Sequence, residues 1–308
     1  MTGTRSPTRP ARPASQVRAI GAVIEAWGSA DGDSRRPDLP WRSTRDPWAV
    51  LVSETLAQQT QLARVVPAYR RFLAAFPTPG ACAAAPLGDV LRAWEGMGYN
   101  RRAVYLHGAA RAIVTVHGGT VPDDLALLLA LPGVGPYTAR AVLAFAFERD
   151  VGVVDTNAGR VIARSVAGRP VGTGDAQSLV DSMVPPGKGW SFGQALLDLG
   201  ATVCTSRAPA CATCPVRRRC RWSAAGHPDP DPSRGSAGVS VRQSRFAGSD
   251  RQGRGRLVSA LRSGPVPSTS VADAAGWPDD PQRAERVAAG LVAEGLAVRG
   301  PGGSLLLP

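Results

Sequence analysis

LPGVGPYTARAV, residues 131–142, joins two segments whose apolar residues recur at helical spacing. Its glycines, Gly133 and Gly135, allow backbone conformations that other residues avoid. The turn can therefore leave successive N–H groups exposed at the start of the next helix, where they and the helix dipole bind a phosphate without reading sequence. Taken alone, the stretch is explained better as a tight helix–helix turn without a ligand. The charge and the cysteines of the rest of the chain favour the phosphate site.

The chain of 308 residues is strongly basic, with a formal net charge of +12. A protein of this charge is expected to meet a polyanion, and nucleic acid is the usual one; a general bias towards arginine is the other explanation. Lys188 is the only lysine. Because arginine does not form a Schiff base, the chain offers almost nothing to a mechanism that needs an amine nucleophile.

Four of the five cysteines fall within 17 residues, in the spacing C-x6-C-x2-C-x5-C. A [4Fe–4S] cluster takes four cysteine thiolates, whereas a four-cysteine zinc site usually has two close pairs. Only one C-x2-C pair is present, so the spacing favours iron–sulfur over zinc. Disulfides are disfavoured by a sequence of cytosolic character. The predicted cluster ligands are Cys204, Cys211, Cys214 and Cys220.

Helical spacing dominates residues 16–206, and strand signals are nearly absent there. The cysteine loop then closes the predicted domain, residues 16–223. Short Pro/Gly breaks separate the segments, which predicts an all-α domain of many short helices. Residues 1–15 form a basic Arg/Pro-rich stretch without the apolar core of a secretory signal, and we expect a disordered tail. No apolar run is long enough for a membrane span, so we expect a cytoplasmic protein. The expected helices are 17–27, 48–56, 65–76, 88–95, 102–116, 123–130, 137–147 and 156–166.

The C-terminal part has a different composition. Residues 224–240 are rich in Pro, Gly and Ser, which predicts a linker, and residues 241–308 predict a small separate module. Helical patterns at 254–261 and 282–294 precede two strand-like runs, 296–299 and 304–307, that flank a Gly-Pro-Gly-Gly turn. Helices followed by a hairpin are typical of a winged-helix-like α+β unit.

Asp155 follows an apolar run, residues 151–154, and precedes a helical segment that begins at Thr156. That is an N-cap position, where backbone N–H groups and the helix dipole favour the ionised carboxylate. The alternative is a structural cap with no other role.

The chain resembles the helix-hairpin-helix DNA glycosylases that carry an iron–sulfur loop, and within them the adenine DNA glycosylases of the MutY type. The superfamily match lies in the hairpin 131–142, in VVDTN (153–157) and in the cysteine loop. The adenine-specific match lies in LPWR (39–42), DPW (46–48), VSETLAQQTQ (52–61) and GMGYNRRA (96–103). These segments cover roughly residues 38–220 in the family's order.

The resemblance implies a division of catalytic work. Glu54, in an apolar helix where desolvation favours a protonated carboxyl, would protonate N7 of a flipped adenine. Asp155 would stabilise the sugar cation or trap it transiently as a covalent adduct, and Asn157 would orient Asp155. Tyr137 stands where relatives that also nick the strand carry a lysine, and tyrosine makes no imine. The resemblance therefore implies a monofunctional glycosylase.

The resemblance also assigns DNA-binding positions. Trp41 and Arg42 match positions near the adenine pocket. Gln58 and Gln59 match glutamines beside the lesion, and Tyr99 matches a tyrosine that wedges next to the base opposite adenine. Core packing is the alternative explanation for Trp41 and Tyr99, and Gly133 and Gly135 would hold the DNA phosphates.

We therefore expect an enzyme that excises adenine paired with 8-oxoguanine or guanine in double-stranded DNA, acting as a monomer at the nucleoid. Two alternatives remain: a thymine or uracil mismatch glycosylase of the same superfamily, and a non-catalytic iron–sulfur DNA-binding protein. Typical members carry a larger C-terminal domain that recognises 8-oxoguanine. Here the small module could replace that reader, or discrimination could rest on the catalytic domain.

Overall fold

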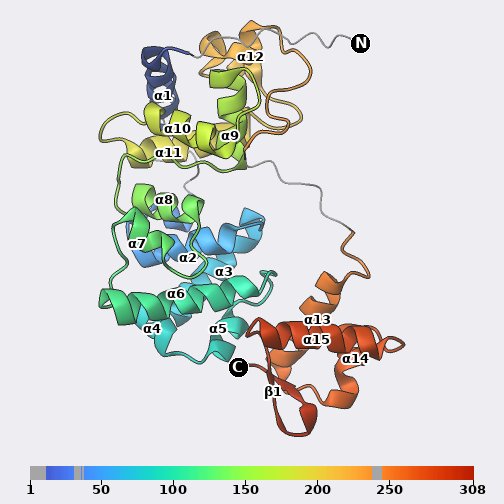
Figure 1. Cartoon of the computed structure of the whole chain (residues 1–308). Helices are drawn as coiled ribbons and strands as arrows, with labels where there is room; N and C mark the ends of the chain where they lie inside the picture. Colours follow the sequence, from blue (N-terminus) through green and yellow to red (C-terminus); the bar gives the residue numbers. More distant parts are fainter. Residues whose placement is uncertain (1–11, 31–35, 37, 238–244) are drawn as a thin grey trace. The chain divides into compact units, whose positions relative to one another are not determined.

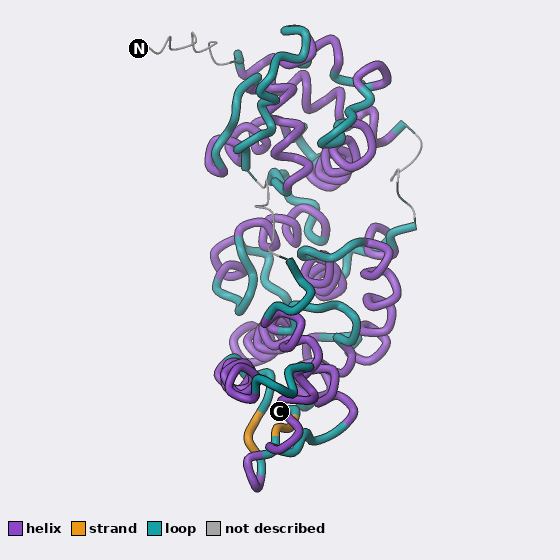
Figure 2. The backbone as a smooth tube through the Cα atoms, turned by 90° about the vertical axis from the view of Figure 1, so that its right-hand side faces the viewer, coloured by secondary structure: helices purple, strands orange, loops and turns teal. Residues whose placement is uncertain are grey.

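The computed structural model describes residues 12–30, 36, 38–237 and 245–308. The chain divides into two compact units, each built from two separate stretches of sequence. Unit 1 is Met1–Arg45 with Ala139–Val241, and unit 2 is Asp46–Thr138 with Arg242–Pro308. Helices make up most of both units, and Figure 2 shows that the strands of the described part are confined to one C-terminal hairpin.

In unit 1, the helices α1, α9, α10 and α11 pack together, and their buried apolar side chains form most of its core (Figure 1). The helix α1 packs closely on α11. The two helices are so close that a Cβ on Gly28 would lie 2.3 Å from the Cβ of Ala195. Glycine is therefore required for this approach. The elements of the unit are α1 (Ala14–Ser29), η1 (Pro40–Arg42), α9 (Thr156–Ile162), η2 (Ala163–Ala167), α10 (Thr173–Met183), α11 (Gly189–Asp198), η3 (Leu199–Val203), η4 (Cys211–Thr213), η5 (Arg217–Arg219) and α12 (Arg221–Ala224).

Two of these elements, η2 and η3, are π-helical turns that continue α9 and α11. Such turns are rare and widen a helix locally, often at functional sites. The second one ends directly before Cys204, where the helical backbone stops. The cysteine loop therefore begins at a helix end that is locally widened.

The first part of unit 2 contains seven helices in chain order. Thr78 caps α4, since its Oγ1 accepts a hydrogen bond from Ala81 N at 3.1 Å, and Pro79 occupies the first turn. The elements are α2 (Pro47–Ala57), α3 (Leu62–Ala75), α4 (Pro79–Ala84), α5 (Leu87–Ala93), α6 (Arg101–His117), α7 (Leu125–Leu129) and α8 (Pro136–Phe145), the last of which continues into unit 1.

The C-terminal module completes unit 2 with three helices and a hairpin (Figure 1). The strands pair antiparallel, with Val298 opposite Leu306 and Arg299 opposite Leu305, and Val266 adds a bridge to Leu305. The predicted winged-helix-like order is confirmed. The elements are α13 (Asp250–Ser263), η6 (Ser268–Ser270), α14 (Val271–Ala275), α15 (Pro281–Ala293), β1 (Val298–Arg299), η7 (Pro301–Gly303) and β2 (Leu305–Leu306).

The sequence-based fold class is confirmed, with each expected helix present and its ends shifted by a few residues. Five helices of the structure were not expected: α4, α10, α11, α12 and α14. Two of them, α4 and α11, begin at Pro79 and Gly189, residues interpreted as helix breaks, because Pro is favoured in a first turn and Gly is tolerated there. Within the described residues, no helix combines the length and the apolar character that a membrane span requires. The expected tail lies largely outside the described residues.

Candidate active site

Glu54 lies on α2, a helix whose side chains from Trp48 to Leu56 are all buried. Asp46 caps the helix, since its Oδ1 accepts from Trp48 N at 3.0 Å. The indole of Trp48 donates to the Phe76 carbonyl at 3.0 Å, which fixes the helix against the end of α3. Glu54 is 8% exposed. The carboxyl group of Glu54 is therefore largely removed from water, and its role as the acid stays a prediction.

Asp155 is the N-cap of α9, as the sequence predicted. Its Oδ1 accepts from Ala158 N at 2.7 Å, and its Oδ2 accepts from Asn157 Nδ2 at 2.8 Å. Burial raises the pKa of the carboxyl above its ordinary value, and the hydrogen bonds oppose that rise without cancelling it. The cap alone predicted the opposite direction, because the sequence did not show how far the carboxyl would be removed from water.

Asn157 is the first step of a chain of hydrogen bonds that leads away from Asp155. Its Oδ1 accepts from Arg160 NH2 at 2.8 Å. The guanidinium of Arg160 also donates to the Cys204 carbonyl and to the Gly200 carbonyl, each at 2.6 Å. The catalytic candidate and the first residue of the cysteine loop are thus connected through two buried or partly buried side chains.

The four predicted ligands, Cys204, Cys211, Cys214 and Cys220, line one cavity together with apolar residues that include Val161 and Leu199. All are free thiols. Burial raises the pKa of Cys214 to about 11, and also raises the pKa of Cys211 and Cys220. Among the described residues, no three His, Cys, Asp or Glu side chains stand in ready metal-binding geometry. The donor set of four thiols facing one pocket is nevertheless the set that a [4Fe–4S] cluster takes.

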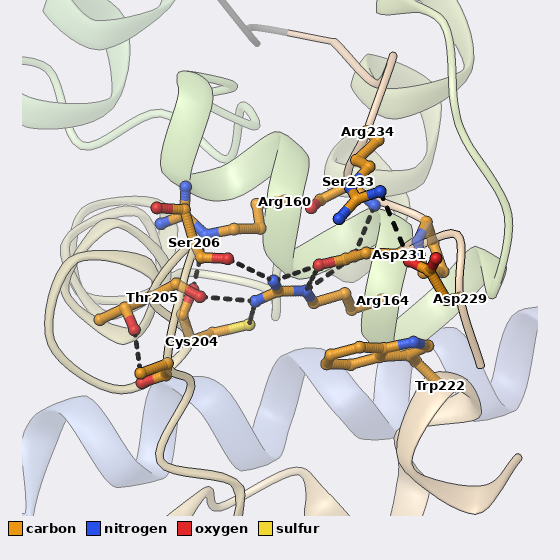
Figure 3. Close-up of polar contacts among 12 residues, drawn as sticks. Arg160, Arg164, Cys204, Thr205, Ser206, Trp222, Asp229, Asp231, Ser233 and Arg234 are labelled. Carbon is orange, nitrogen blue, oxygen red and sulfur yellow. Dashed lines mark hydrogen bonds and ion pairs between the residues drawn. The ribbon is translucent and has the colours of Figure 1, made fainter. Parts of the chain in front are cut away.

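Arg164 lines the same cavity and is a buried cation, only 1% exposed. Its guanidinium donates to Cys204 Sγ at 3.5 Å, to the Thr205 carbonyl at 2.7 Å and to the Ser206 carbonyl at 3.1 Å (Figure 3). The ring of Trp222 lies 4.6 Å from the guanidinium carbon. Arg164 therefore fixes the backbone of the loop as it leaves η3.

Asp231 forms an ion pair with Arg164 and lies in residues 224–240, the segment predicted to be a linker. Its carboxylate accepts three hydrogen bonds from Arg164, among them one from Nε to Oδ1 at 3.0 Å and one from Nε to Oδ2 at 3.2 Å (Figure 3). A few residues later, the Ser236 hydroxyl accepts from Val171 N at 3.2 Å, and Ala237 N donates to the Val171 carbonyl at 2.8 Å. Residues 231–237 are thus packed against the rest of unit 1, and this part of the expected linker is not an extended connector.

The hairpin between α7 and α8 has the form that its glycines predicted. Gly133 has a φ of 74° and a Cβ there would lie 2.5 Å from the Cβ of Tyr105, so only glycine fits. Gly133 and Gly135 are exposed, and Gly135 has open space around it. Tyr137 is partly buried in the first turn of α8. The turn presents backbone to solvent, as phosphate binding needs.

Gln58, Gln59 and Tyr99 lie together around one buried arginine. Arg102 NH1 donates to the Gln58 carbonyl at 2.7 Å, and NH2 donates to the Gly98 carbonyl at 3.2 Å, which ties the two loops together. Burial lowers the pKa of Arg102 to about 10, so it remains a cation at neutral pH. Gln58 also donates to Thr138 Oγ1 at 3.3 Å, next to the hairpin.

Arg42, which is expected near the adenine pocket, makes an ion pair inside unit 1, and its role in binding stays a prediction. Its guanidinium donates to both carboxylate oxygens of Asp198 at 2.7 Å, and it is 8% exposed. This bidentate ion pair commits the charge to the interior of unit 1. Trp41, its neighbour in η1, is partly buried. Arg42 therefore positions the segment that carries Trp41.

The structure groups the predicted residues by unit. Asp155, Asn157 and the cysteines belong to unit 1, whereas Glu54, the hairpin and the glutamine–tyrosine cluster belong to unit 2. Sequence reasoning missed three buried arginines that hold these groups. Arg160 could have been found from its place one turn after Asn157 on the same helix. The contacts of Arg164 and Arg102 join residues far apart in sequence, and no local signal marks them.

Comparison with known proteins identifies the family. Residues 52–175 match the family model described as HhH-GPD superfamily base excision DNA repair protein. A protein of Mycolicibacterium smegmatis named adenine DNA glycosylase is 42% identical over 268 residues, which cover 86% of this chain and 89% of that protein. The chain belongs to the adenine DNA glycosylase family. Its Mycobacterium tuberculosis relative of the same name is 43% identical over 279 residues, 88% of this chain and 89% of that protein.

Other family members and solved structures agree with the fold. The human adenine DNA glycosylase is 38% identical over 224 residues, covering 68% of this chain and 40% of the human protein. A thermostable thymine-DNA glycosylase superposes with a TM-score of 0.62 at 29% identity, covering 68% of this chain and 98% of that one. Endonuclease III in a non-covalent DNA complex gives 0.57 at 23% identity over 70% of this chain and 98% of its own, which supports the fold alone.

Proposed function

We propose that this adenine DNA glycosylase family member removes adenine opposite 8-oxoguanine or guanine in double-stranded DNA and leaves an intact abasic strand. The observation that carries the proposal is the identity of 42% with a protein named adenine DNA glycosylase over 86% of the chain. Glu54 in its buried helix and Asp155 in its capped, desolvated setting support it.

The reaction requires an extrahelical nucleotide, because the glycosidic bond is unreachable in the base stack. Cleavage leaves a poor leaving group and an oxocarbenium-like sugar. Glu54 donates a proton to N7 of adenine, which makes the base a better leaving group. Asp155 faces the positive charge that develops on the sugar, and its low-dielectric setting strengthens that attraction. Two carboxyls in different environments divide the work, as they do in glycoside hydrolysis.

Asn157 and Arg160 hold Asp155 in place. The amide nitrogen of Asn157 donates to one carboxylate oxygen of Asp155, and Arg160 donates to the amide oxygen of Asn157. Asp155 can therefore be retained as an anion in a site where burial alone would favour its protonation. Removal of either partner should affect the rate of base release more than DNA binding.

Strand cleavage is not expected, because the hairpin position of a lyase lysine is occupied by Tyr137. The only lysine, Lys188, is the N-cap residue of α11, is about half exposed and lies 3.9 Å from Glu25. The four cysteines would hold a [4Fe–4S] cluster, which would fix the loop that carries Arg217, Arg218, Arg219 and Arg221. Those arginines suit contact with the phosphate backbone.

The alternative of a thymine or uracil glycosylase is favoured by one observation, the likeness to a thermostable thymine-DNA glycosylase. The test is base release by the whole protein from four matched duplexes: adenine opposite 8-oxoguanine, adenine opposite guanine, thymine opposite guanine and uracil opposite guanine. We expect adenine release from the first two, with strand breaks only after alkali treatment. Release of thymine without adenine would reject the proposal.

A further inference from the structure

Unit 2 contains a groove of about 850 Å³ whose walls come from three distant parts of the sequence. One wall is the loop after α2 with Gln59, the second is the start of α6 with Tyr99 and Tyr105, and the third comes from the C-terminal module. The module contributes Phe246, Arg251 and Arg254. We call this set the aromatic groove.

The module is fixed to the rest of unit 2 next to Tyr99. Arg262 of α13 donates to the Leu91 carbonyl and to Asn100 Oδ1, both at 2.9 Å. At the other end of the module, the Pro308 carbonyl accepts from Gly88 N at 2.9 Å. The third wall of the groove is therefore held by hydrogen bonds on both sides.

The groove collects exposed aromatic rings. In the described part of the chain, the large apolar side chains that remain exposed include three aromatic ones, and all three line the groove: Tyr99 at 44%, Tyr105 at 37% and Phe246 at 57%. Exposed rings of this kind are platforms on which unstacked nucleobases lie. Aliphatic side chains, Val258, Leu291 and Leu296, also line the groove, so the exposed rings are the feature that favours a nucleobase.

An arginine accompanies each of the three rings, and the guanidinium carbon of Arg102 lies 5.7 Å from the centre of the Tyr99 ring. The guanidinium carbon of Arg101 lies 5.1 Å from the centre of the Tyr105 ring, and that of Arg251 lies 6.0 Å from the centre of the Phe246 ring. The one acid that lines the groove, Glu294, is paired with Arg254 at 2.6 Å. The remaining positive charge suits a base that stays attached to its phosphates.

Backbone strain is also concentrated here. Gln59 and Tyr99 have φ angles of 53° and 44°, the left-handed region that residues other than glycine rarely adopt. Both line the groove, and Arg102 holds the loops that carry them. Strained residues held by surrounding structure are found preferentially at functional sites.

We propose that the aromatic groove receives the base opposite the excised adenine and that Phe246 and Arg251 of the C-terminal module are specificity-determining residues for that base. The proposal rests on the proposed function. The sequence left open whether the small C-terminal module takes part in recognising the base opposite adenine. In the structure, the module and the loops that carry Gln59 and Tyr99 line one groove together. The ring of Phe246 stacks on the unpaired purine, and Arg251 donates to its exposed edge.

The turn that carries Phe246 is held for this task. Arg283 donates to the Gly248 carbonyl and to Asp250 Oδ1, each at 2.8 Å, and its guanidinium lies 4.1 Å from the centre of the Trp277 ring. The side chain of Phe246 itself is more than half exposed. Its replacement by alanine is therefore expected to leave the fold intact.

The first test does not depend on catalysis. The whole protein is titrated into a duplex with an uncleavable 2′-fluoro-adenosine opposite 6-methylisoxanthopterin, a fluorescent guanine analogue. We expect a fluorescence change on binding that is largely lost in Phe246→Ala and in Arg251→Gln. The matched controls in the same module are the exposed Val298→Ala and Arg286→Ala, which should behave as the wild type.

The second test compares excision of adenine opposite 8-oxoguanine with excision of adenine opposite an abasic site. The ratio of the two kcat/KM values should fall about tenfold in Phe246→Ala, the order expected for one lost base–aromatic stack. Equal ratios and equal fluorescence changes in the variants and in the controls would overturn the inference. Failure of the wild type to release adenine from any duplex would instead overturn the proposed function, and the fluorescence test would still report on the groove.

Discussion

Replacing Asp231 with alanine should destabilise unit 1 although the residue lies in a Pro/Gly-rich stretch. Burial opposes ionisation of Asp231, but hydrogen bonds from Arg164 and Ser233 outweigh it and lower its pKa from 3.8 to about 2. A difference of one in pKa corresponds to about 1.4 kcal/mol, so the contacts contribute about 2 kcal/mol to the free energy of unfolding at neutral pH. The side chains are 2% and 16% exposed, so solvent screens the pair little.

The expected loss can be measured by thermal denaturation at pH 7. A loss of about 2 kcal/mol lowers Tm by roughly 4–8 °C for a large domain. The matched control is Asp229→Ala, because Asp229 is 80% exposed and pairs with Arg234 at 3.4 Å on the surface. Such a pair contributes about 0–1 kcal/mol.

The pH dependence gives the sign of the effect independently. The pKa of Asp231 is lower in the folded protein, so its contribution is present at all pH values above its ordinary pKa and is lost as the pH falls towards about 2. The difference in stability between the wild type and Asp231→Ala should stay constant from pH 8 to pH 5. Equal Tm values for Asp231→Ala and the wild type at pH 7 would refute the reasoning.

The hairpin and the Asp155 cap give two more predictions. Gly133→Ala should lower the free energy of unfolding by urea by about 1–3 kcal/mol and weaken duplex binding, because a Cβ would lie 2.5 Å from the Cβ of Tyr105 and φ is 74°. The control Gly135→Ala should leave stability nearly unchanged, because there is open space around Gly135. Equal losses of stability in the two variants would contradict the argument. Because the pKa of Asp155 is raised and its anion is needed, kcat/KM should fall on the acidic side at a pH above the ordinary aspartate pKa. Asn157→Ala removes a hydrogen bond that lowers this pKa, so the acidic fall in kcat/KM should move to higher pH. An acidic fall at the same pH in Asn157→Ala and in the wild type would contradict the role of the amide.

The sequence predicted local features and missed long-range ones. The cap at Asp155, the glycine turn at 131–136 and the α+β module follow from patterns within a few residues, and each is present. The packed segment around Asp231 was interpreted as a linker because its composition resembles one. Its partner Arg164 lies 67 residues earlier, and no spacing rule connects them.

The same distinction explains the candidate site. The residue types at 54, 155 and 204–220 are enough to indicate the chemistry, because each stands within a local motif. The commitment of Arg42 to Asp198 and of Arg102 to the two loops required the fold, because each arginine meets partners from other elements. The strained backbone of Gln59 and Tyr99 likewise has no sequence signal, since neither residue is glycine.

The most direct test of the account is single-turnover adenine release from a duplex with adenine opposite 8-oxoguanine, measured for the wild type, Glu54→Gln and Asp155→Asn together with their duplex affinities. The account predicts that each variant binds the duplex as tightly as the wild type and releases almost no adenine, because one carboxyl supplies the proton and the other faces the sugar cation. Adenine release at the wild-type rate by either variant would contradict it.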